Sequence, residues 1–197
     1  MSSPVVLILA AGRGERFLAS GGKTHKLEAL LGGQTVLAHV IRAVEAAALP
    51  WHLVRPEGGT RGMGESISLG VQATAGASGW LILPADLPLI QPASLLRVAE
   101  GLGEKGVVVP YYQQQAGHPV GFRREYREAL LGLGGDRGAR EIVMLARSQG
   151  NVLDLSLADY GVTFDIDTLA DLRTAQEIRY VTSDVPDRDC FNYPYPG

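Results

Sequence analysis

The sequence predicts an α/β fold built on a mostly parallel sheet, because short strand-like apolar runs alternate with helix-like stretches along its 197 residues. A chain of this length can form one domain with a sizeable core. The first apolar run, residues 5–9, leads directly into a glycine-rich loop that carries arginine. Open α/β sheets bind ligands at the carboxyl ends of strands, so this loop is expected to lie at a binding site. Strands are expected at residues 5–9, 52–55, 79–83, 106–109 and 162–166, with a shorter one at 120–122.

Helices are expected between and after these strands. Thr35 is placed to cap a helix whose apolar residues between Val36 and Val44 form one stripe. Thr168 and Asp171 stand three residues apart and resemble a capping box, which begins a last helix that runs to about residue 179. The other helices are expected at residues 64–75, 92–102, 124–131 and 139–149.

Composition excludes several classes of protein. A net charge of −3 gives no basic footprint for nucleic acid, and the lone Cys190 excludes an intramolecular disulfide framework and a cysteine zinc cluster. Residues 1–4 carry no basic leader, and no apolar run approaches the length of a membrane span. We therefore expect a cytoplasmic protein without a membrane or nucleic-acid partner. One domain is expected over residues 1–182, followed by an irregular tail over residues 183–197.

The loop after the first strand is typical of triphosphate binding. Gly12 and Gly14 let backbone N–H groups approach a ligand, and Arg16, Lys23 and Lys26 supply charge for phosphate oxygens. A dinucleotide fingerprint and a Walker loop each require a glycine at position 17, where the chain has phenylalanine. The alternative is a glycine-rich loop that serves for turning alone.

Two acidic segments are candidates for a metal site. Asp86 follows the apolar run 80–83 between two prolines, and a carboxylate in such a stiff turn suits Mg²⁺, which binds one or two carboxylates together with substrate phosphates. Asp86 could instead cap the next helix or face water. In an extended chain Asp165 and Asp167 point to the same side while Ile166 enters the core. One of these two carboxylates could complete the site, and the other could bond a backbone amide.

Three further loops carry polar groups. Residues 62–66 open a helix, so their amides are available to a ligand, although Ser66 could be a simple cap. His118 precedes a proline in extended geometry, and a lone histidine is more often structural. Residues 134–140 form a charged glycine loop before a helix, which by itself indicates a surface turn.

Taken together, these segments resemble the MobA/MocA-like nucleotidyltransferases, which load nucleotides onto the molybdenum cofactor pterin. Seven motifs match in the family's order: residues 9–16, 26–27, 62–66, 84–88, 117–119, 135–140 and 165–168. Ala10-Ala11-Gly12 resembles the cytidylyltransferase type, because the guanylyltransferase branch carries a further glycine there. The resemblance implies a Rossmann-like, three-layer nucleotide-diphospho-sugar transferase fold with a mixed, mostly parallel sheet, and no cofactor beyond Mg²⁺.

Site roles are expected from these motifs. Arg16, Lys26 and Asp86 are the expected catalytic residues, and Mg²⁺ is expected on Asp86 with Asp165 or Asp167. By family resemblance the acceptor would contact His118, Asp136 and Arg140. The expected nucleotide-binding residues are Leu9, Ala10, Ala11, Gly12, Gly14, Lys23, Gly64 and Ser66.

The chain also departs from the family pattern. Residues 49–61 leave room for one strand–helix unit fewer than usual, the insertion at residues 17–22 leaves Lys23 and Lys26 as alternatives, and Leu169 replaces a common proline. The expected partners are an NTP, with CTP favoured and GTP next, and a phosphorylated acceptor such as molybdopterin, with a molybdoenzyme or its accessory protein as a further partner. The alternatives are transfer to another phosphate, such as a sugar phosphate, a phosphocholine-like acceptor or phospholactate, and a non-catalytic maturation factor that delivers the cofactor.

Overall fold

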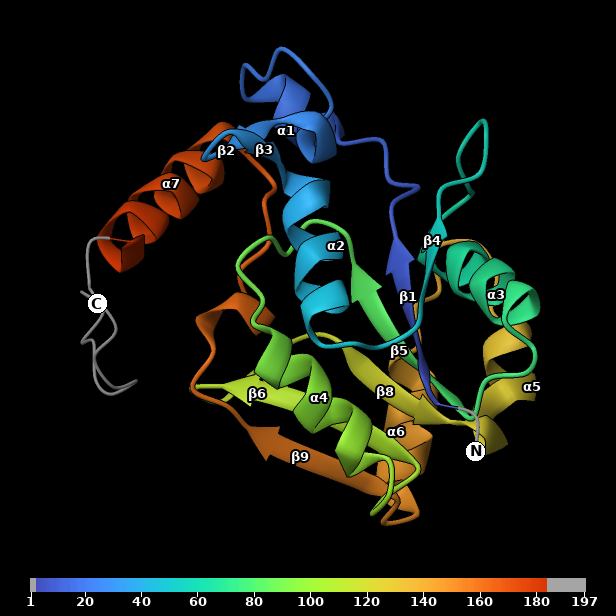
Figure 1. Ribbon diagram of the computed structural model, residues 1–197. Coiled ribbons are helices and arrows are strands. Elements are labelled where there is room, and N and C mark those ends of the chain that lie inside the picture. Colours follow the sequence, from blue (N-terminus) through green and yellow to red (C-terminus); the bar gives the residue numbers. More distant parts are fainter. Residues whose placement is uncertain (1–2, 184–197) are drawn as a thin grey trace.

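The computed structural model describes residues 3–183 and shows one mixed β-sheet with helices on both faces (Figure 1). Its strands are β1 (Val5–Leu9), β4 (Trp51–Val54), β5 (Gly79–Pro84), β6 (Val107–Tyr112), β7 (Gln115–Ala116), β8 (Val120–Arg123) and β9 (Val152–Ser156). The order is β4-β1-β5-β8-β6-β7, and β9 pairs with the other edge of β6. Strands β4, β1 and β5 are parallel, whereas β8 is antiparallel to β5 and β6. The predicted α/β architecture is confirmed.

The expected helices are present with small shifts at their ends. The helices are α1 (Glu15–Ala19), α2 (Val36–Ala46), α3 (Met63–Ala73), α4 (Pro92–Gly101), α5 (Arg127–Leu131), α6 (Arg140–Ser148) and α7 (Leu169–Ser183). Short 3₁₀ turns are η1 (Lys26–Glu28), η2 (Arg124–Tyr126) and η3 (Tyr160–Val162), and β2 (Leu30–Leu31) and β3 (Gln34–Thr35) form a hairpin. The expected helix 124–131 is therefore divided between η2 and α5. Among the described helices, none is long and apolar enough to cross a membrane.

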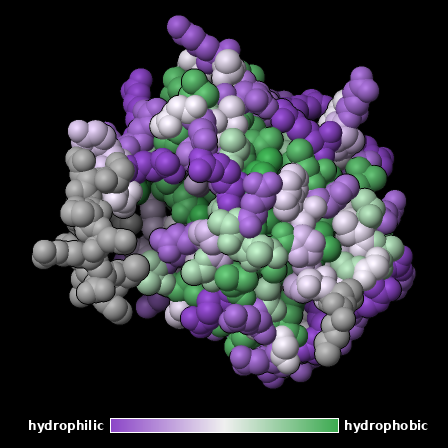
Figure 2. All heavy atoms as spheres, in the orientation of Figure 1, coloured by the Kyte–Doolittle hydropathy of each residue, from purple (hydrophilic) through white to green (hydrophobic). Residues whose placement is uncertain are grey.

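The sheet separates two hydrophobic clusters, because successive side chains of a strand point to opposite faces. In β1, Val6 and Ile8 pack on the side of α2 and α4, whereas Leu7 packs on the side of α3, α5 and α6. In β5, Leu81 and Ile82 divide in the same way. On the outer surface seen in Figure 2, hydrophilic and hydrophobic residues are interspersed.

The predicted strand at residues 162–166 is wrong. Residues 160–162 form η3, and the chain then runs to α7 without regular secondary structure and without joining a sheet ladder. A backbone bond anchors this segment beside the end of β5: the Ile166 N–H donates to the Asp86 carbonyl at 2.9 Å. Ile166 is fully buried and anchors the segment to the core. Its apolar side chain between polar neighbours produced the alternating pattern that predicted a strand. The last strand is β9, whose exposed Asp154 broke the apolar run expected of a core strand.

Helix α7 begins with the predicted capping box. The Thr168 N–H donates to the Asp171 carboxylate at 2.7 Å, and the Asp171 N–H donates to the Thr168 hydroxyl at 3.3 Å. Farther along, Arg179 donates to Nδ1 of His39 at 3.3 Å, while Nε2 of His39 bonds the Leu31 carbonyl at 2.6 Å. Burial lowers the pKa of His39, which favours the neutral ring that these two bonds require. The helix is thus fixed to α2 and the β2–β3 hairpin. The expected tail lies, from residue 184 onward, outside the described residues.

Candidate active site

The loop that follows β1 is shaped by its two glycines in different ways. Gly14 has a φ of 66°, a conformation that glycine adopts without strain, and it caps α1. A Cβ built on Gly12 would meet no atom within 4 Å, although Gly12 lines a cavity. The missing side chain of Gly12 therefore leaves room for a ligand rather than for packing within the protein.

His25 fixes this loop, a role that the sequence did not indicate. Its Nε2 bonds the Gly12 carbonyl at 2.7 Å, and its Nδ1 accepts from the Leu27 N–H at 3.2 Å. The imidazole also stands 3.2 Å from the position that a Cβ on Gly14 would take. The histidine thereby joins the glycine loop to η1, which carries Lys26. No spacing rule points to this bond, because it depends on the turn between residues 14 and 25.

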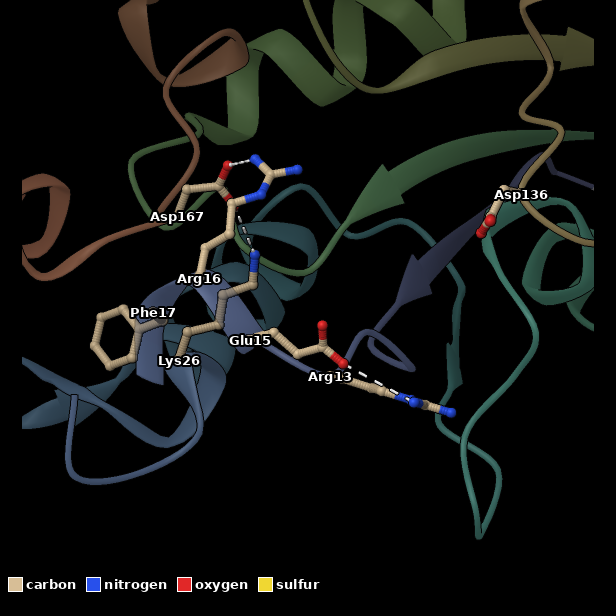
Figure 3. A pocket seen from close by; sticks show the side chains of 8 residues that line it. Arg13, Glu15, Arg16, Phe17, Lys26, Asp136 and Asp167 are labelled. Carbon is tan, nitrogen blue, oxygen red and sulfur yellow. Dashed lines mark hydrogen bonds and ion pairs between the residues drawn. The ribbon is translucent and has the colours of Figure 1, made fainter. Parts of the chain in front are cut away.

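Cations and carboxylates from four separate segments meet next to the loop. The Lys26 ammonium donates to Asp86 at 2.7 Å and to Asp167 at 3.2 Å. Arg16 pairs with the other oxygen of Asp167, as Figure 3 shows. Asp86 follows β5, whose end lies beside that of β1 because Leu9 pairs with Pro84. The sheet therefore brings together residues that lie up to 151 positions apart.

The pair between Lys26 and Asp86 is shielded from water, with side chains that are only 14% and 18% exposed. Burial by itself lowers the pKa of Lys26, but the carboxylates of Asp86 and Asp167 outweigh that effect and raise it. Lys26 therefore stays charged through the physiological range. A fixed positive charge at this place is suited to phosphate oxygens.

Three carboxylates form a cluster that can hold a divalent cation. Ligand oxygens from Asp86, Asp165 and Asp167 all lie within 4.8 Å of one another. Hard oxygen donors in this number fit Mg²⁺, which completes its shell with substrate phosphates and water. Burial, followed by the charges of Asp86 and Asp167, raises the pKa of Asp165, as expected where like charges are crowded. The cluster thus fits the predicted metal, and a cation would relieve its repulsion.

Two adjoining cavities, of about 670 and 420 Å³, open at the glycine loop, and we call them the loop cavities. In Figure 3, Arg16 and Asp167 lie on one side of the smaller one and Asp136 on the opposite side. Their combined size suits a nucleotide. Lining residues common to both are Arg13, Glu15, Arg16, Lys26 and Asp136.

The far wall of the loop cavities is the start of α3, against which residues 134–138 pack. The Gly64 N–H donates to the Gly135 carbonyl at 2.9 Å. A Cβ on Gly64 would lie 2.3 Å from the Arg137 carbonyl, so only glycine permits this approach. Close by, the hydroxyls of Thr60 and Ser66 bond at 2.7 Å, and both residues line the larger cavity. No motif in the sequence points to Thr60.

A third cavity, of about 270 Å³, lies beyond Asp86, and we call it the His118 cavity. Burial lowers the pKa of His118, although Asp86 and a hydrogen bond with the Ile82 carbonyl act in the opposite direction. Its Nδ1 is buried and has no hydrogen-bond partner in the described chain. Asp86 lines both this cavity and the larger loop cavity, so the carboxylate cluster stands between them.

The predicted site residues divide among these features. Leu9, Ala10, Ala11, Gly12 and Ser66 line the larger loop cavity, and Gly14 lines the smaller one. Asp165 lines the His118 cavity, whereas Asp167 lines the smaller loop cavity. Asp136 lies on the loop cavities, away from His118, with which it was grouped as an acceptor residue. Lys23 and Arg140 are exposed and line none of the three cavities.

A matched pair of glycine variants tests this description. Gly64→Ala forces a Cβ against backbone, and overpacking of this kind costs about 1–3 kcal/mol, so urea denaturation should show a clear loss of stability. Gly12→Ala should leave the free energy of unfolding unchanged, because its Cβ meets nothing. It should weaken nucleotide binding measured by calorimetry. Equal stability of the two variants would contradict the packing described for α3.

Comparison with known proteins identifies the family. Residues 45–152 match the model of the MobA-like NTP transferase domain. The chain therefore belongs to the MobA-like NTP transferases, as its motifs predicted, and is a member of a nucleotidyltransferase family.

Solved structures share the fold at low sequence identity. A nucleotidyl transferase of Methanothermobacter thermautotrophicus (Mth528) is 20% identical, with a TM-score of 0.76, over 92% of this chain and all of that one. Rv0371C of Mycobacterium tuberculosis H37Rv, in a complex with manganese, is 23% identical, with a TM-score of 0.65, over 89% of this chain and 99% of that one. Molybdopterin-guanine dinucleotide biosynthesis protein A of Archaeoglobus fulgidus is 16% identical, with a TM-score of 0.60, over 90% of this chain and 99% of that one. These likenesses confirm the predicted fold class.

One curated protein matches a short stretch. The putative LysR family substrate binding domain-containing protein YagP of Escherichia coli (strain K12) is 85% identical over 26 residues. The match covers 13% of this chain and 19% of that protein, so it describes a segment and not the whole of either.

Proposed function

We propose that this protein transfers CMP from CTP to the phosphate of a small acceptor, molybdopterin or its molybdenum-bound form, and releases pyrophosphate. The observation that carries the proposal is the position of Asp86. It pairs with Lys26 and lines both the larger loop cavity and the His118 cavity. Two substrates bound in these cavities would meet at one carboxylate, as a transfer reaction requires.

The nucleotide is assigned to the loop cavities. Backbone amides of Ala11 and Gly12 would contact the base and ribose, beside the hydroxyls of Thr60 and Ser66. The Gly64 amide, which was expected to join them, donates to the Gly135 carbonyl instead. Ala10-Ala11-Gly12, without a further glycine, supports cytosine over guanine by its likeness to the cytidylyltransferase type. Asp136 belongs with the nucleotide in this assignment, since it lines these cavities.

Arg16 and Lys26 are assigned to the triphosphate. Both line the loop cavities and each is paired with a carboxylate, which it can exchange for a phosphate oxygen without leaving the site. They would neutralise the charge that develops on the departing pyrophosphate.

Mg²⁺ is assigned to Asp86 with Asp165 or Asp167. When bound, it would polarise the phosphate oxygens and reduce the charge between the two substrates. The raised pKa of Asp165 and the 4.8 Å spread of the three carboxylates support this assignment.

The acceptor is assigned to the His118 cavity. An acceptor phosphate oxygen would form a bond to the α-phosphorus of CTP while the bond from that phosphorus to the bridging oxygen breaks, and the bridging oxygen leaves with pyrophosphate. The attacking oxygen is already anionic near neutral pH, so no strong general base is needed. Catalysis then depends on position and charge neutralisation. We place the reaction in the cytoplasm, in one domain over residues 1–182, with a molybdoenzyme or its accessory protein as the recipient of the product.

The test is calorimetric binding of CTP, GTP, ATP and UTP, each with and without Mg²⁺, followed by an assay of pyrophosphate release with molybdopterin. We expect CTP to bind most tightly and Mg²⁺ to strengthen its binding. A preference for GTP would replace the cytidylyl assignment with a guanylyl one. Binding of nucleotide without pyrophosphate release would favour a non-catalytic maturation factor.

A further inference from the structure

His25 connects two segments of the nucleotide site through one imidazole ring. Its Nδ1 accepts from the Leu27 N–H at 3.2 Å, so the proton of the neutral ring is on Nε2, which donates to the Gly12 carbonyl at 2.7 Å. A single tautomer therefore satisfies both bonds. Among the hydrogen bonds found in residues 3–183, the bond to Gly12 is the one that joins the loop after β1 to residues 24–28.

The loop after β1 is shaped to receive this ring. Gly14 has a φ of 66°, and a Cβ on it would stand 3.2 Å from Nε2 of His25 and 3.5 Å from Cγ of Lys26. The imidazole and the stem of Lys26 therefore lie directly against the backbone of the loop, in space that a side chain at position 14 would need. This contact and the bond to Gly12 together fix the loop relative to η1.

Gly12 depends on the bond because its own backbone is weakly restrained. Glycine has more conformational freedom than any other residue, and a Cβ on Gly12 would meet no atom within 4 Å. In a trans peptide the carbonyl and the following N–H point in opposite directions, so the bond from His25 also fixes the direction of the Arg13 N–H. Without the bond this peptide is free to rotate, and its carbonyl oxygen can turn toward the anionic nucleotide.

The two segments that His25 joins are assigned to different halves of the nucleotide. Gly12 and Lys26 both line the larger loop cavity, where Gly12 is assigned to the nucleoside and Lys26 to the triphosphate. A ligand that reaches both gains affinity when their spacing is fixed, because the second contact then forms within a complex that is already bound. His25 lines none of the three cavities, so it acts through these two residues.

We propose that His25 is a positioning residue for the nucleotide: by bonding Gly12 and capping η1, it sets the spacing between the nucleoside-binding loop and Lys26. This inference rests on the proposed function, because it assumes that one nucleotide spans both segments. Loss of the bond to Gly12 should therefore weaken the binding of a complete nucleotide more than the binding of either half.

Two variants separate the bond to Gly12 from the cap of η1. The asparagine side chain places an acceptor where Nδ1 lies, so His25→Asn keeps the cap and loses the donor that reaches Gly12. The glutamine side chain is longer by one methylene and places an amide N–H where Nε2 lies, so His25→Gln keeps the donor. His52→Asn is the matched control, because His52 is half-buried on β4 and lines none of the three cavities.

The full chain and each variant are titrated by calorimetry with CTP in the presence of Mg²⁺, and CMP and inorganic tripolyphosphate are measured by displacement of bound CTP. His25→Asn should weaken CTP binding by about tenfold, near the upper limit for one lost hydrogen bond. CMP and tripolyphosphate should bind to it as they do to the wild type. His25→Gln should restore most of the CTP affinity, and His52→Asn should leave all three affinities unchanged.

The outcomes separate this inference from the proposed function. Equal CTP affinity in His25→Asn and the wild type overturns the inference and leaves the nucleotide assignment standing. An equal loss for CTP, CMP and tripolyphosphate also overturns it, because a role in folding alone would lower all three together. If the wild type binds GTP instead of CTP, the cytidylyl assignment fails and the same comparison is made with GTP and GMP. A wild-type chain that binds no nucleotide overturns the proposed function, and this inference with it.

Discussion

Replacement of Asp86 with asparagine is expected to lower turnover by about 10²–10⁴, the usual loss when a central electrostatic group is removed from an active site. Asp86 is the carboxylate common to the larger loop cavity and the His118 cavity, and it is only 18% exposed. Asparagine keeps the size and removes the charge, so nucleotide binding without metal should persist while the gain from Mg²⁺ is lost. Steady-state pyrophosphate release and calorimetry with and without Mg²⁺ measure both.

Asp154→Asn is the control for Asp86→Asn. Asp154 also forms an ion pair, with Arg147, but at an exposed position of the edge strand β9. It should change turnover by less than twofold. If Asp86→Asn kept Mg²⁺-dependent turnover within a few-fold of the wild type, Asp86 would be removed from the reacting centre.

Replacement of Lys26 with methionine should weaken nucleotide binding by about 10- to 100-fold, since a charge-assisted hydrogen bond contributes about 1.5–3 kcal/mol. Turnover should fall as well, because the same ammonium would neutralise the departing pyrophosphate. In the absence of nucleotide, the same variant should bind a divalent cation more tightly than the wild type. Lys26 bonds two of the three clustered carboxylates, so without it their negative charge is no longer neutralised by the protein, and the affinity for Mn²⁺ should rise.

Lys23→Met is the matched control for Lys26→Met. Lys23 lies three positions away, is exposed and lines none of the three cavities. It should leave nucleotide affinity and Mn²⁺ affinity as they are in the wild type. If Lys23→Met lost nucleotide affinity and Lys26→Met kept it, the two lysines would have to exchange roles.

Local signals predicted much of the fold. The buried run of β1, the Thr35 cap of α2, which accepts from the Ala38 N–H at 3.1 Å, and the Thr168–Asp171 capping box depend on residues a few positions apart. They could be recognised because the secondary-structure propensity of the residues, the hydrophobic pattern and the capping residues all indicate the same element at each place. The strand β9 could not be recognised in this way, because the exposed Asp154 interrupts the apolar pattern of this half-buried edge strand.

The site was predictable in its residue types and not in its connections. Arg16 and Asp86 were selected by their positions after strands and Lys26 by its place in the family motif, and the structure brings the three together. The bond from His25 to Gly12 and the packing of residues 134–138 on Gly64 depend on tertiary geometry. The sequence alone could not say that Asp165 and Asp167 line different cavities, because that division depends on where the extended segment crosses the end of β5.

The attachment of α7 has a consequence for the carboxylates that precede it. Asp165 and Asp167 belong to no sheet ladder. Their segment is held by the backbone bond from Ile166 to Asp86, by the ion pairs of Asp167 with Arg16 and Lys26, and by the start of α7. Near its far end α7 is bound to α2, because Arg179 donates to His39. The helix therefore restricts the movement of Asp165 and Asp167, two of the three candidate metal ligands. The geometry of the reacting centre is thus maintained partly by a helix that contributes no lining residue to any of the three cavities.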